Sequence, residues 1–377
     1  MRVIEVAGLG PGPFCGMMLS DMGADVLTID RGARAADPAD PLQRNRHRIA
    51  LNLKSDAGRE ALLKLVDRAD VLFESYRPGV AERLGFGPEV CLRRNPKLVY
   101  GRMTGWGQQG PLATAAGHDI NYVALSGALH AIGRRGEKPT PPLNLVGDFG
   151  GGGMLLAFGI ACALLEAQRS GRGQVVDAAM VDGSIALMAM FIGMQRQGLW
   201  NDAVGSNFLS GAAHYYDTYE TSDGKFISIG ALEPQFYSLL IDKAGLDAVT
   251  FGHAGMEGSS GYDAQLWSTL KAKLTDVFKT RTREQWCSIL EGTDVCFAPV
   301  LSLSEAPRHP HNLARNAFVE VAGHMQNAPA PRFSRTPAAS PQPSRQDADS
   351  LNALMKRWGH DVADVGSILA AQIEPRK

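Results

Sequence analysis

Asp148 has surroundings in this sequence that favour chemistry. It shortly precedes four consecutive glycines, residues 150–153, and then a long apolar segment that predicts a helix. Aspartate is a good helix N-cap, so capping alone would explain its type. Four glycines lose much backbone entropy on folding and are a poor choice for stability. Their use would be to bring a ligand close to a helix N-terminus, where free amides and the helix dipole suit a developing oxyanion.

His118, in the stretch Gly117-His118-Asp119, is a second candidate for proton transfer. An imidazole titrates near neutral pH, so a histidine held by a carboxylate can act as a general base. Asp119 and Glu233 are candidate partners, although the sequence alone does not show that either touches the ring. Taken singly, His118 is more typical of a buried histidine whose ring nitrogens are hydrogen-bonded. Glu233, taken singly, is more typical of a glutamate that faces solvent at the end of a strand.

A glycine-rich turn near the start resembles a dinucleotide-binding fingerprint. Gly8, Gly10 and Gly12 follow an apolar strand, and Asp30 ends the next one. The fingerprint requires a glycine where Pro13 stands, and prolines lack the amide that a pyrophosphate would need. We therefore expect a tight turn of a nucleotide-binding-like fold, with NAD binding disfavoured.

The elements that must position these residues alternate between strand and helix in the first hundred positions. Strands are predicted at 3–6, 25–29, 71–73 and 97–100, and helices at 14–22 and 55–65. Such alternation implies βαβ units and a parallel sheet. A long apolar helix should begin at Asp148 and end near Ser170, before Gly171.

The pattern changes after about residue 198. Strands joined by a Ser-Asp-Gly turn follow in 214–232, then two helical segments, and residues 326–346 are rich in Pro, Ser and Ala. We expect a large Rossmann-like α/β domain and a smaller α+β domain, followed by a linker and a C-terminal return to the large domain. Their predicted ranges are 1–195, 205–320 and 326–377.

Composition excludes several classes of protein. The chain has 377 residues, 45% apolar and 20% charged, with a net charge of −1, so no basic excess favours nucleic acid. Five scattered cysteines without a CxxC pair disfavour a disulfide framework and a metal site. The start predicts a strand and not a signal peptide, and no run reaches about 18 apolar residues. We expect a cytoplasmic protein without a membrane partner.

Several motifs in order resemble the α-methylacyl-CoA racemase branch of the family III CoA-transferases. They are GHDINY at 117–122, NLVGDFGGG at 144–152, GQVVDAAMVDGS at 173–184, YYDTYE at 215–220 and ALEPQFY at 231–237, with RPGVAERLGFGP at 77–88 and RMTGWGQQGP at 102–111. The resemblance spans nearly the whole chain. It implies an interlocked homodimer, an acyl-CoA substrate held by its CoA part, and no metal or redox cofactor.

The resemblance also implies roles for individual residues. His118 matches the base on one face of the α-carbon and Asp148 the base on the other. Glu233 matches the carboxylate that orients His118, and Asp119 supports the same neighbourhood. Inversion at carbon needs two bases, because one proton leaves on one side and another arrives on the opposite side. Backbone amides at the glycine-rich helix start would stabilise the enolate oxygen.

The phosphates of CoA should be met by arginines, whose fork suits phosphate oxygens. The resemblance suggests two arginines, with a glutamate, a tyrosine and a glycine near the same ligand: Arg77, Arg83, Glu74, Tyr122 and Gly117. The cluster QRNRHR adds Arg44, Arg46 and Arg48, for which phosphate binding and a solvated surface charge are equally typical.

Two alternatives stay open. In a CoA-transferase, Asp148 would be a nucleophile, and His118 argues against that because a transferase needs no second base. A non-catalytic CoA-binding protein would not need His118, Asp148 and Glu233 together.

His214 stands where we expect proline, which affects the expected substrate preference and not the reaction type.

Overall fold

The computed structural model describes residues 1–32, 37–252 and 264–373. The chain forms two compact units, the first from Met1–Ser126, Leu143–Met188 and Ala314–Lys377, the second from Gly127–Pro142 and Ala189–Leu313. This division differs from the expected ranges, because Gly127–Pro142 and α9 (Ala189–Arg196) pack in the second unit. Asp202 links the two segments: its main-chain carbonyl accepts from the His130 ring and its side chain accepts from Gln195 Nε2, each at 2.7 Å.

The first unit is built on a six-stranded sheet in which every neighbouring pair is parallel. The strands are β1 (Arg2–Val6), β2 (Asp25–Asp30), β3 (Arg46–Ala50), β4 (Val71–Glu74), β5 (Val99–Thr104) and β6 (Val175–Ala179). Their order is β3-β2-β1-β4-β5-β6, the doubly wound order of dinucleotide-binding folds. The central strands are continuous apolar runs because helices cover both faces. The predicted α/β fold with a Rossmann-like parallel sheet is confirmed.

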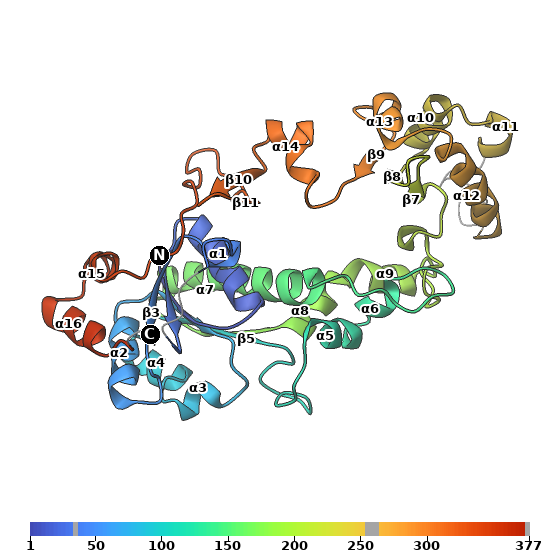
Figure 1. Ribbon diagram of the computed structural model, residues 1–377. Coiled ribbons are helices and arrows are strands. Elements are labelled where there is room, and N and C mark those ends of the chain that lie inside the picture. The colour runs from blue at the N-terminus through green and yellow to red at the C-terminus, as the bar shows by residue number, and fades with distance from the viewer. Residues whose placement is uncertain (33–36, 253–263, 374–377) are drawn as a thin grey trace. The chain divides into compact units, whose positions relative to one another are not determined.

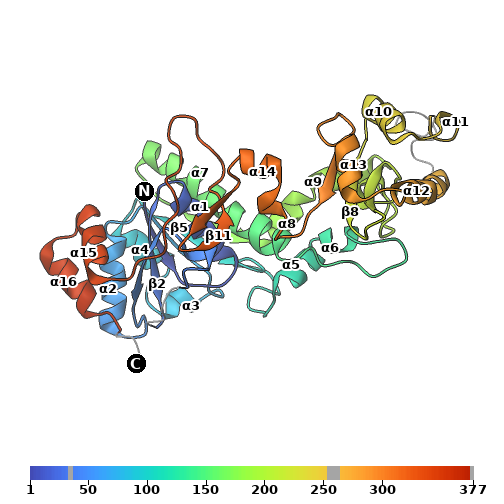
Figure 2. The same cartoon turned by 45° about the horizontal axis from the view of Figure 1, so that its top comes forward.

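Two separate apolar cores lie on the two faces of this sheet. On one face, Ile4 and Leu27 pack with α2 (Asp56–Val66), α4 (Pro88–Arg94), α15 (Ala348–Arg357) and α16 (Val362–Ala370). On the other, Val3 and Phe73 pack with α1 (Pro11–Asp21) and α7 (Leu155–Ser170). Figures 1 and 2 show α2, α15 and α16 together on one side of the strands and α1 and α7 on the other.

The glycine-rich segment folds differently from the prediction. Leu145–Met154 is a π-helix that continues into α7, so Asp148 lies inside a helix and does not begin one. The glycines serve close packing: a Cβ on Gly151 would lie 2.7 Å from the Ser184 amide of α8 (Met180–Leu187), and one on Gly153 would lie 2.5 Å from the Pro11 carbonyl of α1. Backbone contact between helices accounts for Gly151 and Gly153.

The joined helix Leu145–Ser170 has another notable property. This helix is long enough and apolar enough, with a mean hydropathy of 1.6, to span a membrane. It is the one helix in the described parts of the chain that meets both criteria. Leu156 and Ile160 on one of its faces are fully buried against the sheet. Phe158 and Leu165 on the opposite face are 67% and 53% exposed.

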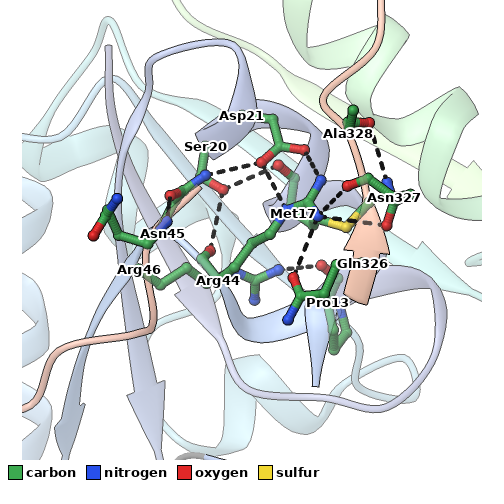
Figure 3. Close-up of polar contacts among 11 residues, drawn as sticks. Pro13, Met17, Ser20, Asp21, Arg44, Asn45, Arg46, Gln326, Asn327 and Ala328 are labelled. Atoms are coloured by element: carbon green, nitrogen blue, oxygen red, sulfur yellow. Dashed lines mark hydrogen bonds and ion pairs between the residues drawn. The ribbon is translucent and has the colours of Figure 1, made fainter. Parts of the chain in front are cut away.

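The C-terminal return is pinned to α1 by a buried arginine (Figure 3). Arg44 pairs with Asp21 at 2.5 Å and donates to the Asn327 carbonyl at 2.6 Å, at the end of the hairpin β10 (Phe318–Val321) and β11 (His324–Asn327). Both charged side chains are at most 3% exposed. Arg44 is therefore a structural residue, and its suggested role as a phosphate ligand is wrong.

The second unit is a small α+β body. Its antiparallel sheet contains β7 (Tyr216–Glu220), β8 (Phe226–Gly230) and β9 (Phe297–Val300), and the predicted turn between β7 and β8 is confirmed, with Gly224 at φ +70°. Trp267, Phe278 and Trp286 lie in its core. Its main helices are α10 (Pro234–Ala244), α12 (Ala264–Phe278) and α13 (Arg283–Leu290). The remaining short helices of the two units are α3 (Val80–Arg83), α5 (Asp119–Leu125), α6 (Ala128–Ala131), α11 (Ala248–Phe251) and α14 (Pro310–Ala314).

Candidate active site

A cavity of about 1600 Å³ opens at the carboxyl ends of the parallel strands in the first unit. Residues following β1, β2, β4 and β5 line it, so it lies where the strand order reverses between β1 and β4. Ligands of open α/β sheets bind at this switch point, because the connections on either side of it leave a crevice. His118, Asp148, Tyr122 and Arg77 all line this one cavity.

Asp148 is held by contacts from three directions. Its Oδ2 accepts from Asn144 Nδ2 at 2.7 Å, and its backbone amide donates to Asp119 Oδ1 at 2.6 Å. Gly10, the N-cap of α1, has φ +68°, and a Cβ there would lie 2.9 Å from Asp148 Oδ2. The glycine turn that resembled a dinucleotide fingerprint is thus a close neighbour of this carboxylate. The positive end of the α1 dipole favours negative charge there.

The Asp119 side chain holds the main chain of Asp148, and its support of His118, which the sequence suggested, stays a prediction. Its carboxylate is buried and accepts the Asp148 amide, which fastens α5 to the π-helix. Burial raises the pKa of Asp119, and the negative charge of Asp148 raises it further. The hydrogen bond donated by the Asp148 backbone amide opposes this shift. A Cβ on Gly147 would lie 2.3 Å from Asp119 Oδ1, so this glycine leaves room for the carboxylate.

His118 is the N-cap of α5, and its exposed side chain lines the cavity. Its amide donates to Asn121 Oδ1 at 3.0 Å, which holds the first turn of the helix. The local fold therefore places the imidazole at a helix start, on the same cavity as the Asp148 carboxylate.

Glu233 belongs to the second unit. It is the exposed N-cap of α10, between β8 and the helix, and Pro234 at the first helical position fits that start. The first unit thus brings together His118, Asp148, Asp119, Gly117 and Tyr122, whereas Glu233 lies on the other body.

Tyr122 and Gly117 form one wall of the cavity with Trp106. The Tyr122 hydroxyl donates to the Gly117 carbonyl, and the Tyr122 ring meets the Trp106 ring edge-on at 4.7 Å. A Cβ on Gly117 would lie 2.7 Å from the Tyr122 ring, so glycine is required here. Burial raises the pKa of Tyr122, and the Asp148 charge adds to that shift.

The arginines suggested for CoA separate into exposed and buried residues. Arg77 is exposed on the cavity wall, and Arg83 is exposed on α3 outside the lining. Arg46 is 2% exposed, pairs with Glu5 and donates to the Pro13 carbonyl, which gives it a structural role, and its contact with CoA stays a prediction. The charges of Arg46 and Glu5 compensate each other inside the sheet. Arg48 pairs with Asp30 at 2.8 Å.

Glu74 shapes the cavity loop without lining it. Its buried carboxylate accepts the Tyr76 amide and lies 3.5 Å from Arg102. Burial raises the pKa of Glu74 to about 7, although the hydrogen bond from the Tyr76 amide and the positive charge of Arg102 both act to lower it.

Arg31 also lines the cavity and was not among the residues predicted from the sequence. Its guanidinium lies 4.6 Å above the Tyr76 ring and donates to the Tyr76 hydroxyl at 3.2 Å, and both residues line the cavity. Its position directly after Asp30, at the end of a predicted strand, was the available signal. The oxyanion amides expected of glycines 150–153 stay a prediction, because in the described residues these glycines do not line the cavity. Nor do the described ranges contain a group of three metal-ligating side chains.

Known proteins resemble this chain along most of its length. The mouse (Mus musculus) protein named alpha-methylacyl-CoA racemase is 47% identical over 339 residues, which cover 90% of this chain and 87% of the relative. The human (Homo sapiens) protein of the same name is 44% identical with the same coverage. A solved CaiB/BaiF family protein from Brucella suis shares the fold, with a TM-score of 0.80 at 22% identity over 95% of this chain and 98% of the other.

The family model for CoA-transferase family III matches residues 1–348. This match, the two mammalian relatives and the doubly wound sheet agree with one another. The chain is a member of CoA-transferase family III.

Proposed function

We propose that this chain is a racemase that interconverts the two configurations at C2 of 2-methylacyl-CoA thioesters. The observation that carries this proposal is the single cavity shared by His118 and Asp148, because inversion at carbon needs two proton-transfer groups. Relatives named alpha-methylacyl-CoA racemase support the substrate class. Such substrates would place the reaction in lipid metabolism.

The proposed reaction consists of two proton transfers with an enolate between them. Ionised Asp148 or neutral His118 removes the α-proton, and the C–H electron pair moves into the thioester carbonyl. The other group, in its acid form, then returns a proton to the opposite face. No other atom is gained or lost. The two groups must hold opposite protonation states at the start of each passage, which requires tuned pKa values.

Arg31 and Arg77 are the residues that we propose for the phosphates of CoA, since both guanidinium groups lie on the cavity. The Tyr76 ring beneath Arg31 keeps that side chain ordered before a ligand arrives. Arg83 stays a candidate from the resemblance. Tyr122 and Gly117 would shape the wall near the thioester. CoA is part of the substrate, and the proton transfers need no metal or redox cofactor.

We propose a homodimer in which Glu233 orients His118, as the family resemblance implies. Exposed apolar side chains on α7 and α8 support an interface: Phe158 is 67% exposed, Leu165 53% and Leu187 53%. A monomeric mass in solution would contradict this part of the proposal. We further propose a cytoplasmic location, with neither nucleic acid nor membrane as partner.

The test is proton exchange during turnover. The protein is incubated with one enantiomer of a 2-methylacyl-CoA in heavy water, without an added carboxylic acid. Deuterium at the α-carbon with loss of configuration, across at least one of several acyl chains, would support the racemase.

The rival is a CoA-transferase with Asp148 as nucleophile. It predicts no α-exchange with any acyl chain, and movement of CoA to an added carboxylic acid through a covalent adduct on Asp148. CoA binding with neither reaction would instead identify a non-catalytic binding protein.

A further inference from the structure

His214 lies in the core of the second unit, and the reaction described above gives it no role. It is fully buried, and its Nε2 lies 2.8 Å from the Tyr237 hydroxyl. The Tyr215 and Tyr237 rings meet the imidazole edge-on, at centroid distances of 5.0 and 5.5 Å. The imidazole is therefore held between the chain that precedes β7 and the helix α10.

Stability alone is a poor explanation for a histidine at this position. Nδ1 of His214 is buried and, among the described residues, has no hydrogen-bond partner. A buried polar atom without a partner lowers the free energy of unfolding, so its presence calls for another reason. The contact with the Tyr237 hydroxyl is what a histidine supplies here, and the proline expected at this position could not make it.

The contact fastens the start of α10. Tyr237 lies in the first turn of this helix, and its amide donates to the Glu233 carbonyl at 3.0 Å. On the other side of Glu233, the Ala231 amide donates to the Tyr215 carbonyl at 3.0 Å. Two adjacent residues, His214 and Tyr215, thus hold the chain on both sides of Glu233.

Glu233 is an unusual residue for the start of a helix. Asparagine, aspartate and serine are the preferred N-caps, because their short side chains reach the free amides of the first turn. Within the described chain, the exposed Glu233 side chain makes no capping hydrogen bond. Its main chain is therefore held while its carboxylate stays available to another group.

Resting on the proposed function, in which Glu233 orients His118, we propose that His214 is a positioning residue for the Glu233 carboxylate. It acts through Tyr237, since their hydrogen bond fixes the first turn of α10 and with it the direction of the Glu233 side chain. Small displacements of a group that orients a base are costly for the rate. Loss of the hydrogen bond should therefore lower kcat and change KM by less than about twofold.

The test is a double-mutant cycle between Tyr237→Phe and Glu233→Gln, followed by racemisation kinetics. Tyr237→Phe keeps the ring and removes the hydroxyl, and kcat should fall by about 5- to 10-fold in the parent background. In the Glu233→Gln background the same change should have no further effect, because the carboxylate that it positions is absent. His214→Leu should show the same pattern. Equal losses in both backgrounds, or parent kcat in Glu233→Gln, would overturn the proposal.

Tyr219→Phe is the matched control. It removes another buried hydroxyl from the same core, and the hydrogen bond that is lost goes to the His214 main-chain carbonyl and not to α10. Both Tyr→Phe variants should be less stable than the parent protein, but kcat should fall in Tyr237→Phe alone. Equal losses of kcat in the two variants would show general loosening of the core and would overturn the proposal.

Hydrogen exchange of the Phe236 and Tyr237 amides gives a readout that is independent of turnover, because both amides donate to the Glu233 carbonyl. Their exchange should become about fivefold faster in Tyr237→Phe and stay unchanged in Tyr219→Phe. Unchanged exchange in both variants would overturn the proposal. Absence of α-proton exchange in the parent protein would refute the racemase separately.

Discussion

The Asp119 carboxylate accepts the backbone amide of Asp148 at 2.6 Å, so one acidic residue holds the main chain beneath another. The bond joins α5, whose N-cap is His118, to the π-helix that carries Asp148. Both proton-transfer candidates are therefore fastened through one buried side chain. A displacement of either helix would therefore change the distance between the His118 and Asp148 side chains.

Asp119→Ala should lower kcat by about 10- to 100-fold, since small displacements of catalytic groups are costly. It should also lower the free energy of unfolding by about 1–3 kcal/mol, because a buried amide loses its acceptor. Asp119→Asn keeps an oxygen acceptor and should retain most of the stability. Racemisation rates and urea unfolding measure both effects. Full activity in Asp119→Ala would show that the link between the helices is dispensable.

Gly10→Ala should disturb Asp148 directly. The new Cβ would lie 2.9 Å from Asp148 Oδ2, and kcat should fall by about 100-fold. Gly23→Ala is the matched control: Gly23 also has positive φ, +92°, and no described atom lies within 4 Å of a Cβ built there. Both variants should lose about 1 kcal/mol of stability from the left-handed conformation. Equal kcat values for the two variants would contradict the contact with Asp148.

His214 should make the second unit sensitive to acid. Its ring is fully buried, Nε2 lies 2.8 Å from the Tyr237 hydroxyl, and burial together with the Lys271 charge lowers its pKa to about 3. The unfolded histidine titrates near 6.5, so the unfolded state binds the proton first as pH falls. The stabilisation is present above about pH 6.5 and is lost between about pH 6.5 and 3, by up to about 1.4 kcal/mol per pH unit.

The measurement for His214 is chemical unfolding followed by tryptophan fluorescence at several pH values from 7 to 4.5. Trp267 and Trp286 report on the same core. His214→Gln should flatten the pH dependence relative to the parent protein, even if it lowers stability at pH 7. Parallel curves for the two proteins would show that His214 does not titrate on unfolding.

Asp21→Ala should be strongly destabilising because it leaves the Arg44 guanidinium buried without its counter-charge (Figure 3). The expected loss is about 3–5 kcal/mol. Asp56→Ala removes a comparable contact to Arg59 at 2.8 Å, but there the side chains are 93% and 37% exposed. Its loss should stay below about 1 kcal/mol. Thermal or urea unfolding of both variants tests the difference, and similar losses would show that burial does not control the effect.

Much of the first unit could be predicted from local pattern. The strands at 3–6, 25–29 and 71–73 are apolar runs bounded by turn residues, and Ser55 caps α2 as expected, accepting the Gly58 amide at 3.1 Å. β3 could not be read in this way. Its sequence Arg-His-Arg-Ile-Ala is typical of a surface, and it becomes a strand because Arg46 and Arg48 find carboxylates in Glu5 and Asp30.

The sequence by itself determined the α/β class, the candidate residues and their order. His118, Asp148 and Tyr122 were identified from residue type, spacing and resemblance, and one cavity brings them together. Tertiary structure decided what each neighbour does. Asp119 turned out to hold the Asp148 amide, Arg46 to neutralise a buried charge, and Gly151 and Gly153 to pack helices. The physical reason is that ion pairing, burial and backbone contact depend on partners 23 or more positions away, whereas helix and strand patterns are local.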